Sequence, residues 1–64
     1  MIEIVYDSGL KNIFYIYSET ETHIVWEDYA SNLIRLNKYS GKISLLHDNE
    51  WIPYDLKITS YTRL

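Results

Sequence analysis

The sequence predicts an all-β fold, an antiparallel meander of about five or six strands that curls into a small barrel or a compact sandwich. The chain has 64 residues, which is enough for a single domain over residues 1–64. Helix-forming residues are scarce, because alanine occurs once, at Ala30, and glutamine is absent. β-branched and aromatic residues, which suit a pleated and half-buried surface, are abundant instead.

Short β-rich runs bounded by turn residues such as Asp7-Ser8-Gly9 recur along the chain, as antiparallel strands require. We expect strands near residues 2–6, 13–18, 23–27, 33–37, 42–47 and 51–56, with a weaker run near 57–62. One stretch, 26–36, could be arranged as a helix, but its apolar residues fit strands equally well. No linker or repeat interrupts this pattern.

The first of two informative turns lies at Asn37–Lys42. A type I turn followed by a residue with positive φ suits this segment, and Gly41 adopts positive φ at little steric cost. This turn places Leu36 opposite Ile43 and sends both side chains to one face of the hairpin.

The second informative turn, at Asp48–Asn49, predicts the same register independently. A two-residue loop there places Leu46 opposite Trp51 and Leu45 opposite Ile52, so that the middle strand keeps its apolar face. The predicted core face of this three-stranded meander consists of Ile34, Leu36, Ile43, Leu45, Ile52 and Tyr54. The reverse face carries an apolar spot formed by Leu46 and Trp51.

In the N-terminal half, the turn at Glu19–Thr22 predicts a hairpin with a specific register. It would place Tyr17 opposite Ile24 and Tyr15 opposite Trp26. The strand before this turn is apolar on both faces, which is typical of a strand buried on both sides. In so small a domain, such a strand is either central or part of an interface.

The last confident strand contains Pro53, which has no N–H group to donate to a sheet. This strand should therefore lie at an edge of the sheet or be bulged. The segment Trp51–Tyr54 is similar to the last strands of SH3 domains, which makes an SH3-like barrel the main alternative fold.

No constellation of catalytic, metal-binding or cofactor-binding residues is apparent. There is no cysteine, which excludes disulfides and cysteine-ligated metals. His23 and His47 could form a metal site only with an aspartate such as Asp28 or Asp48, and exposed turn positions explain them better. The isolated glycines belong to turns rather than to a phosphate-binding loop. We therefore expect neither an enzyme nor a bound cofactor.

The charge and hydropathy of the chain argue against two classes of partner, nucleic-acid duplexes and membranes. The net charge is −3 and the six lysines and arginines are scattered, whereas a duplex-binding or membrane-binding protein concentrates positive charge on one face. We expect a cytoplasmic protein without a membrane association, since no signal peptide or spanning segment is visible. An acidic chain could instead approach a basic surface on another protein.

Aromatic residues are the notable surplus: seven tyrosines, two tryptophans and one phenylalanine. Most should pack in the core, but tyrosine and tryptophan are also enriched at the centres of interfaces. The candidate interaction residues are Tyr15, Tyr17, Trp26, Tyr29, Tyr39, Leu46 and Trp51. We expect a homodimer that pairs through the Ile13–Tyr17 strand or through the Leu46 and Trp51 face.

Three functions remain open from these observations. The first is a non-enzymatic protein-binding module, and the composition, rich in residues with AT-rich codons, suggests a phage or mobile-element inhibitor of a host defence protein. The second is a structural or assembly subunit that acts through homo-oligomerisation. The third is an aromatic surface that binds a small ligand or single-stranded nucleic acid, which the acidic balance disfavours.

Overall fold

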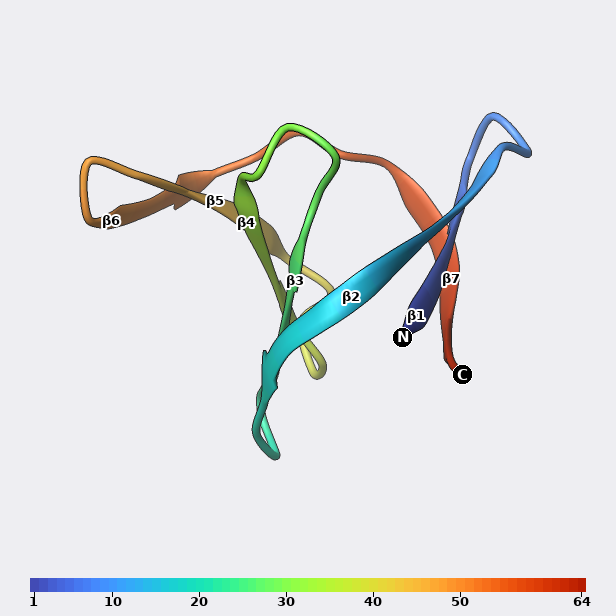
Figure 1. Ribbon diagram of the computed structural model, residues 1–64, viewed down its shortest axis with the longest axis horizontal. Helices are drawn as coiled ribbons and strands as arrows, with labels where there is room; N and C mark the ends of the chain where they lie inside the picture. The colour runs from blue at the N-terminus through green and yellow to red at the C-terminus, as the bar shows by residue number, and fades with distance from the viewer.

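The computed structural model describes residues 1–64 as one antiparallel sheet of seven strands without a helix (Figure 1). The strands are β1 (Ile2–Tyr6), β2 (Lys11–Glu19), β3 (His23–Glu27), β4 (Leu33–Asn37), β5 (Ile43–His47), β6 (Glu50–Pro53) and β7 (Ile58–Arg63). The all-β antiparallel prediction is confirmed. The weak run near 57–62 is a full strand, so the sheet has seven strands rather than five or six.

The sheet is an open meander whose strand order is β6-β5-β4-β3-β2-β1-β7. Each of the first six strands lies beside its neighbour in sequence, and β7 returns to pair with β1. The curled sheet does not close into a barrel, because β6 and β7 remain its two edges. Pro53 lies in β6, so the prediction that its strand forms an edge of the sheet is confirmed.

Strand β2 is shared between two halves of the sheet. Its first residues pair with β1, up to Phe14 opposite Ile2, and its later residues pair with β3, starting with Tyr15 opposite Glu27. Figure 1 shows β2 crossing from the half that contains β1 and β7 to the half that contains β3–β6. The two halves diverge along β2, and the core fills the space between them.

The core contains eight buried apolar residues drawn from five strands: Ile2, Ile4, Phe14, Ile24, Trp26, Ile34, Leu36 and Ile43. Phe14 and Trp26 stack with ring centroids 6.4 Å apart. Burial of side chains this large gives about 1.5–3 kcal/mol each relative to exposure, so this cluster supplies most of the stability.

The predicted register of the C-terminal meander is confirmed. Leu36 pairs with Ile43, and Leu45 pairs with Ile52. Gly41 has φ 75°, as the first turn requires. In the second turn Asp48 and Asn49 have φ 50° and 63°, which matches a type I′ hairpin.

Burial along the predicted core face fades toward the edge of the sheet. Ile34, Leu36 and Ile43 are buried, whereas Leu45 and Ile52 are half-buried. Tyr54, which follows β6, is 39% exposed. The edge strand has no neighbouring strand to cover its outer residue, so its share of the core is smaller.

The predicted register of the N-terminal hairpin is wrong. Tyr15 pairs with Glu27 instead of Trp26, and Glu19 pairs with Ile24 in place of Tyr17. The register shifts between Ile16 and Ser18, where one extra residue forms a β-bulge. Tyr17 therefore has no direct partner, and strand alternation alone could not predict this.

The strands predicted at 23–27 and 33–37 are confirmed, and the stretch 26–36 is not a helix. Asp28 accepts hydrogen bonds from the backbone N–H groups of Ala30 and Asn32 at 2.9 and 2.8 Å and forms a turn between them. One further N-terminal expectation is corrected. Strand β2 is central, but it is not buried on both faces. Tyr15 and Tyr17 are exposed on its outer side, while Phe14 is buried on its inner side.

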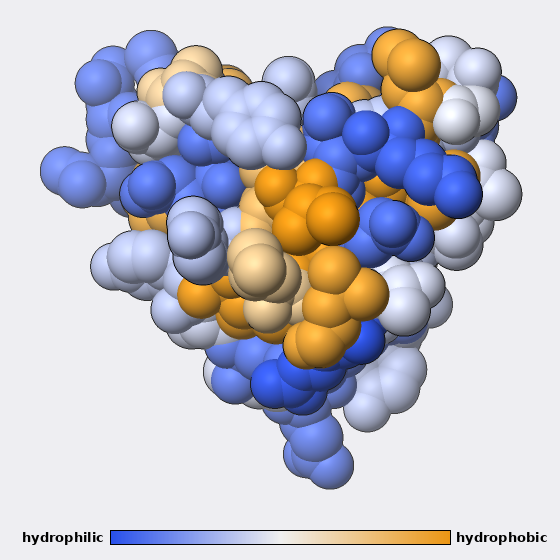
Figure 2. All heavy atoms as spheres, turned by 45° about the vertical axis from the view of Figure 1, so that its right-hand side comes forward, coloured by the Kyte–Doolittle hydropathy of each residue, from blue (hydrophilic) through white to orange (hydrophobic).

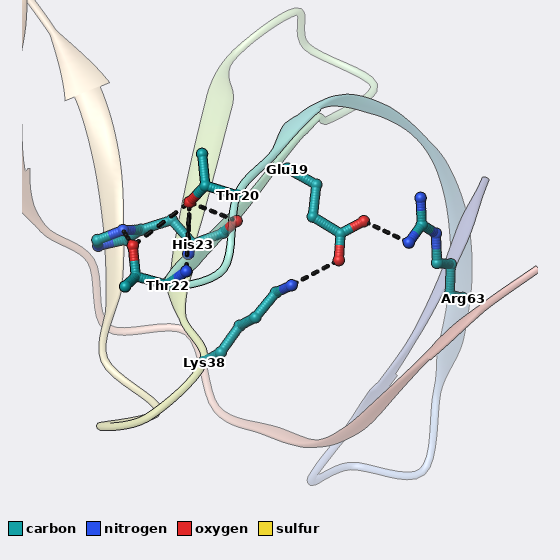
Figure 3. A network of polar contacts seen from close by, with 6 residues as sticks. All are labelled: Glu19, Thr20, Thr22, His23, Lys38 and Arg63. Carbon is teal, nitrogen blue, oxygen red and sulfur yellow. Dashed lines mark hydrogen bonds and ion pairs between the residues drawn. The ribbon is translucent and has the colours of Figure 1, made fainter.

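A charged network joins three segments that are distant in sequence (Figure 3). The Glu19 carboxylate, at the end of β2, meets Lys38 Nζ at 2.6 Å and Arg63 Nη1 at 2.7 Å. Lys38 lies in the β4–β5 turn and Arg63 at the end of β7. The network therefore links β7 to the other half of the sheet, where no strand pairing does so.

Candidate interaction surface

The structure places the predicted interaction residues in three different environments. Four tyrosines are exposed, with relative exposures of 76% for Tyr15, 66% for Tyr17, 75% for Tyr29 and 77% for Tyr39. Leu46 and Trp51 are half-buried on the outer face of the sheet. Trp26 is only 1% exposed, so it belongs to the core and not to an accessible surface.

Two of the exposed tyrosines, Tyr15 and Tyr29, line a common pocket between β2 and the β3–β4 turn. This pocket, here named the β2 pocket, has a volume of about 370 Å³. Its lining consists of Met1, Ile13, Phe14, Tyr15, Glu27, Asp28, Tyr29 and Ser31. Figure 2 shows an apolar patch in the middle of the face that carries β1 and β7, surrounded by polar residues.

Tyr29 is exposed but held in place. Its hydroxyl donates a hydrogen bond of 2.9 Å to the backbone oxygen of Ile13. Ile13 lies in the part of β2 that extends beyond the end of β3. Its ring also packs on Phe14 with a centroid separation of 4.9 Å. An aromatic side chain fixed in this way loses little conformational entropy when a ligand covers it.

The rim of the β2 pocket is acidic. Glu27 and Asp28 both line it, and neither forms an ion pair. Glu3 lies opposite Ile13 on β1 and adds a further carboxylate beside the pocket. No lysine or arginine lines the pocket, and the α-ammonium of Met1 is the one cationic group among its lining residues, so the rim keeps a net negative charge.

A second aromatic region lies on the outer face of β4–β6, here named the Trp51 patch, and consists of Leu46, Trp51 and Arg35. Leu46 pairs directly with Trp51 across the hairpin. The Arg35 guanidinium lies over the Trp51 ring at 4.4 Å from its centroid, which is a cation–π contact. This ring is thus already covered by a cation of the same chain.

The two histidines and Ser40 each have a partner nearby in the chain. The imidazole Nδ1 of His23 lies 2.7 Å from the Thr22 hydroxyl, and His47 Nε2 lies 3.4 Å from Asp48. No group of three histidine, cysteine, aspartate or glutamate side chains is arranged to hold a metal ion. The Ser40 hydroxyl accepts a hydrogen bond from the Lys42 N–H in its own turn.

Two side chains have perturbed ionisation. The hydrogen bond from Lys38 holds the pKa of the Glu19 carboxyl below its usual range, and the charge of Arg63 lowers this pKa further. Burial raises the pKa of the Tyr6 phenol, to which Tyr29 also contributes. Neither group lines the β2 pocket, so these shifts bear on stability rather than on the candidate surface.

Sequence reasoning identified Tyr15 and Tyr29 separately but not that they share a pocket. It missed Ile13, Glu27 and Asp28 as members of the same surface. One signal was present, since an aspartate directly after a strand often begins a hydrogen-bonded turn. Such a turn at Asp28 brings the next residue, Tyr29, back over β2.

Comparison of the chain with protein-family models, curated proteins and solved structures finds no match. The structure has no helix, and therefore none that is long and apolar enough to cross a membrane. The functional argument therefore depends on the geometry and charge of the described surface.

Proposed function

We propose that this chain is a non-enzymatic protein-binding module whose contact surface is the outer side of β2 together with the β3–β4 turn. The observation that carries the proposal is the β2 pocket, where Tyr15 and Tyr29 are about three-quarters exposed and Tyr29 is held by a hydrogen bond. Rigid exposed tyrosines are the side chains that contribute most to interface centres. For the biological context, we propose that the chain is a phage-encoded inhibitor and that its partner is a host protein.

The Trp51 patch supports this choice of surface by contrast. Its aromatic ring is half-buried and already contacts Arg35. The tyrosine rings of the β2 pocket are exposed, and no other side chain covers them as Arg35 covers Trp51. A partner therefore gains more new contact area at the β2 pocket than at the Trp51 patch.

The test is affinity capture from a lysate of a low-GC bacterium. The immobilised wild-type chain is compared with the double variant Tyr15→Ala/Tyr29→Ala and with Tyr39→Ala, which removes an equally exposed tyrosine from the distant β4–β5 turn. We expect one specific partner that wild type and Tyr39→Ala retain and that the double variant loses. Recovery of no partner above background, or equal recovery with the double variant, would contradict the proposal.

Self-association is the second candidate function, and one structural difference favours it. The β6 edge is short and carries Pro53, whereas the other edge strand, β7, has six residues and no proline. An unblocked edge can pair with a second copy of the same strand. Light scattering after size-exclusion chromatography should then show a dimer, and Tyr61→Pro in β7, which removes an N–H group on the open side of the strand, should return it to a monomer.

A monomer at tens of micromolar would exclude the self-association candidate and leave the protein-binding proposal intact. Tyr61 lies opposite Ile4 of β1, so the variant's fold must be checked by circular dichroism. Lys57→Pro, outside the strand, is the matched control for the introduced proline. A dimer that survives both substitutions would locate the contact elsewhere.

A further inference from the structure

We infer that the β2 pocket accepts an arginine side chain of the partner protein, with the guanidinium between the tyrosine rings and the acidic rim. This inference deepens the proposed function, on which it rests only for the source of the arginine. It concerns the chemistry of the pocket, which can be tested with a small probe even if the partner is unknown.

The first argument is charge complementarity. Glu27 and Asp28 line the pocket, Glu3 lies opposite Ile13 beside it, and none of the three is ion-paired. No lysine or arginine lines the pocket. The whole chain carries a net charge of −3, which favours a cationic partner at longer range.

The second argument is the nature of the walls. Tyr15 and Tyr29 supply aromatic rings, while Met1 and Ile13 supply apolar contact for the stem of a long side chain. Cations are attracted to aromatic faces, and arginine takes part in such contacts more often than lysine. Its planar guanidinium also donates several hydrogen bonds in a fork that matches a carboxylate.

The third argument is the way in which the acidic groups are oriented. Asp28 Oδ1 accepts hydrogen bonds from the N–H groups of Ala30 and Asn32, and Oδ2 lies 3.5 Å from the Asn32 side-chain amide, so this carboxylate is held in its own turn and adds charge to the rim. Glu27 has no such partner and is exposed. A guanidinium would therefore pair directly with Glu27, which can move to complete the contact, while Asp28 contributes its charge.

The molecule itself contains a comparable contact. Arg35 lies over the Trp51 ring at 4.4 Å on the same sheet. There the cation is supplied by a neighbouring strand. At the β2 pocket the aromatic and acidic groups are present without a lysine or arginine, and the α-ammonium of Met1 offsets only part of the acidic charge.

The experiment is a two-dimensional ¹H–¹⁵N NMR titration of the full chain with N-acetyl-arginine methylamide. The matched probe is N-acetyl-citrulline methylamide, which has the same shape without the charge. We expect saturable shifts at Ile13, Tyr15, Glu27 and Tyr29 with a Kd of about 1 mM, and at least about tenfold weaker binding of citrulline.

Variants locate the effect. Glu27→Gln should weaken binding by roughly two- to fivefold, because an exposed ion pair contributes little, and Tyr29→Leu should weaken it by roughly three- to tenfold. Glu21→Gln and Tyr39→Leu make the same chemical changes in exposed turns away from the pocket and should leave binding unchanged. Dispersed spectra of each variant show that the fold is retained.

Three results would overturn the inference: no localised shifts, equal binding of citrulline, or tighter binding of N-acetyl-lysine methylamide than of the arginine probe. None of these results depends on the capture experiment. A captured partner together with a silent titration would retain the binding module and reject the arginine pocket. A positive titration without a captured partner would support the pocket and reject the protein-binding proposal.

Discussion

Two aromatic regions on the outer side of one continuous sheet differ in what accompanies them. In the Trp51 patch, the ring is half-buried and the Arg35 guanidinium lies 4.4 Å from its centroid. In the β2 pocket, Tyr15 and Tyr29 are 76% and 75% exposed, carboxylates form the rim, and no cationic side chain lines it. The comparison teaches that aromatic content alone does not mark a binding surface. The decisive difference is whether another side chain of the same chain already covers the ring.

The largest expected effect is the difference in stability lost when an aromatic ring is removed from each region. Phe14 is buried under Tyr29 and stacks on Trp26, so Phe14→Ala should lower the free energy of unfolding by about 3–5 kcal/mol. Trp51→Ala should cost only about 1 kcal/mol, because this ring is half-buried. Urea unfolding followed by circular dichroism measures both.

Phe14→Leu is the control, since it keeps an apolar side chain and should lose clearly less stability than Phe14→Ala. A cost at Trp51 equal to that at Phe14 would mean that the Trp51 patch is part of the core. The two regions would then differ less than the structure indicates.

Acid should weaken the ion-pair network that links β7 to the other half of the sheet. Because the folded-state pKa of Glu19 lies below its ordinary value of 4.5, its ion pairs stabilise the fold above that pH. This stabilisation should be lost as the pH falls through the lowered folded-state pKa. Thermal unfolding measured from pH 7 down to pH 2 should therefore show a falling melting temperature below about pH 4.5.

Glu19→Gln should lower the stability at pH 7 and reduce this pH dependence. Glu21→Gln, a matched substitution in the adjacent exposed turn, should do neither, because Glu21 forms no ion pair. If the two variants behave alike at every pH, the network of Glu19, Lys38 and Arg63 does not stabilise the open side of the sheet.

The hydrogen bond that fixes Tyr29 should have a smaller effect. Tyr29→Phe removes the contact to the Ile13 oxygen while keeping the ring, and should cost about 0.5–1.5 kcal/mol of stability. Tyr39→Phe removes a hydroxyl for which no hydrogen bond is present, and should be nearly neutral. Equal costs would show that Tyr29 is not held in place and that the pocket is not preorganised.

The smallest expected effect is the coupling between Arg35 and Trp51. A double-mutant cycle with Arg35→Met and Trp51→Leu should give a coupling of about 0.5–1 kcal/mol, typical of a cation–π contact near the surface. A coupling near zero would mean that Arg35 does not occupy the ring. The Trp51 patch would then be as available to a partner as the β2 pocket.

The C-terminal meander was predictable because each of its turns is encoded by local residues. Gly41 permits the positive φ of one turn, and Asp48 with Asn49 adopts the type I′ turn of the other. Both turns specify the register without help from distant contacts. The edge position of β6 followed from Pro53 for the same local reason.

The N-terminal half was less predictable because its geometry depends on the tertiary fold. The bulge between Ile16 and Ser18 shifts the pairing of β2 with β3, shortly after the strand has passed from one half of the sheet to the other. No local residue pattern announces this change. The β2 pocket lies where β2 extends beyond the end of β3. The sequence could therefore identify single residues of the pocket but could not predict that they lie together.

The most direct test of the contrast between the two regions is an intermolecular NOE experiment with N-acetyl-arginine methylamide bound to the wild-type chain. NOEs from the probe's side-chain methylenes to the ring protons of Tyr15 and Tyr29, with none to Trp51, are the predicted result. NOEs to Trp51 of similar strength, or none to either tyrosine, would contradict the claim that the unfilled aromatic site lies at the β2 pocket.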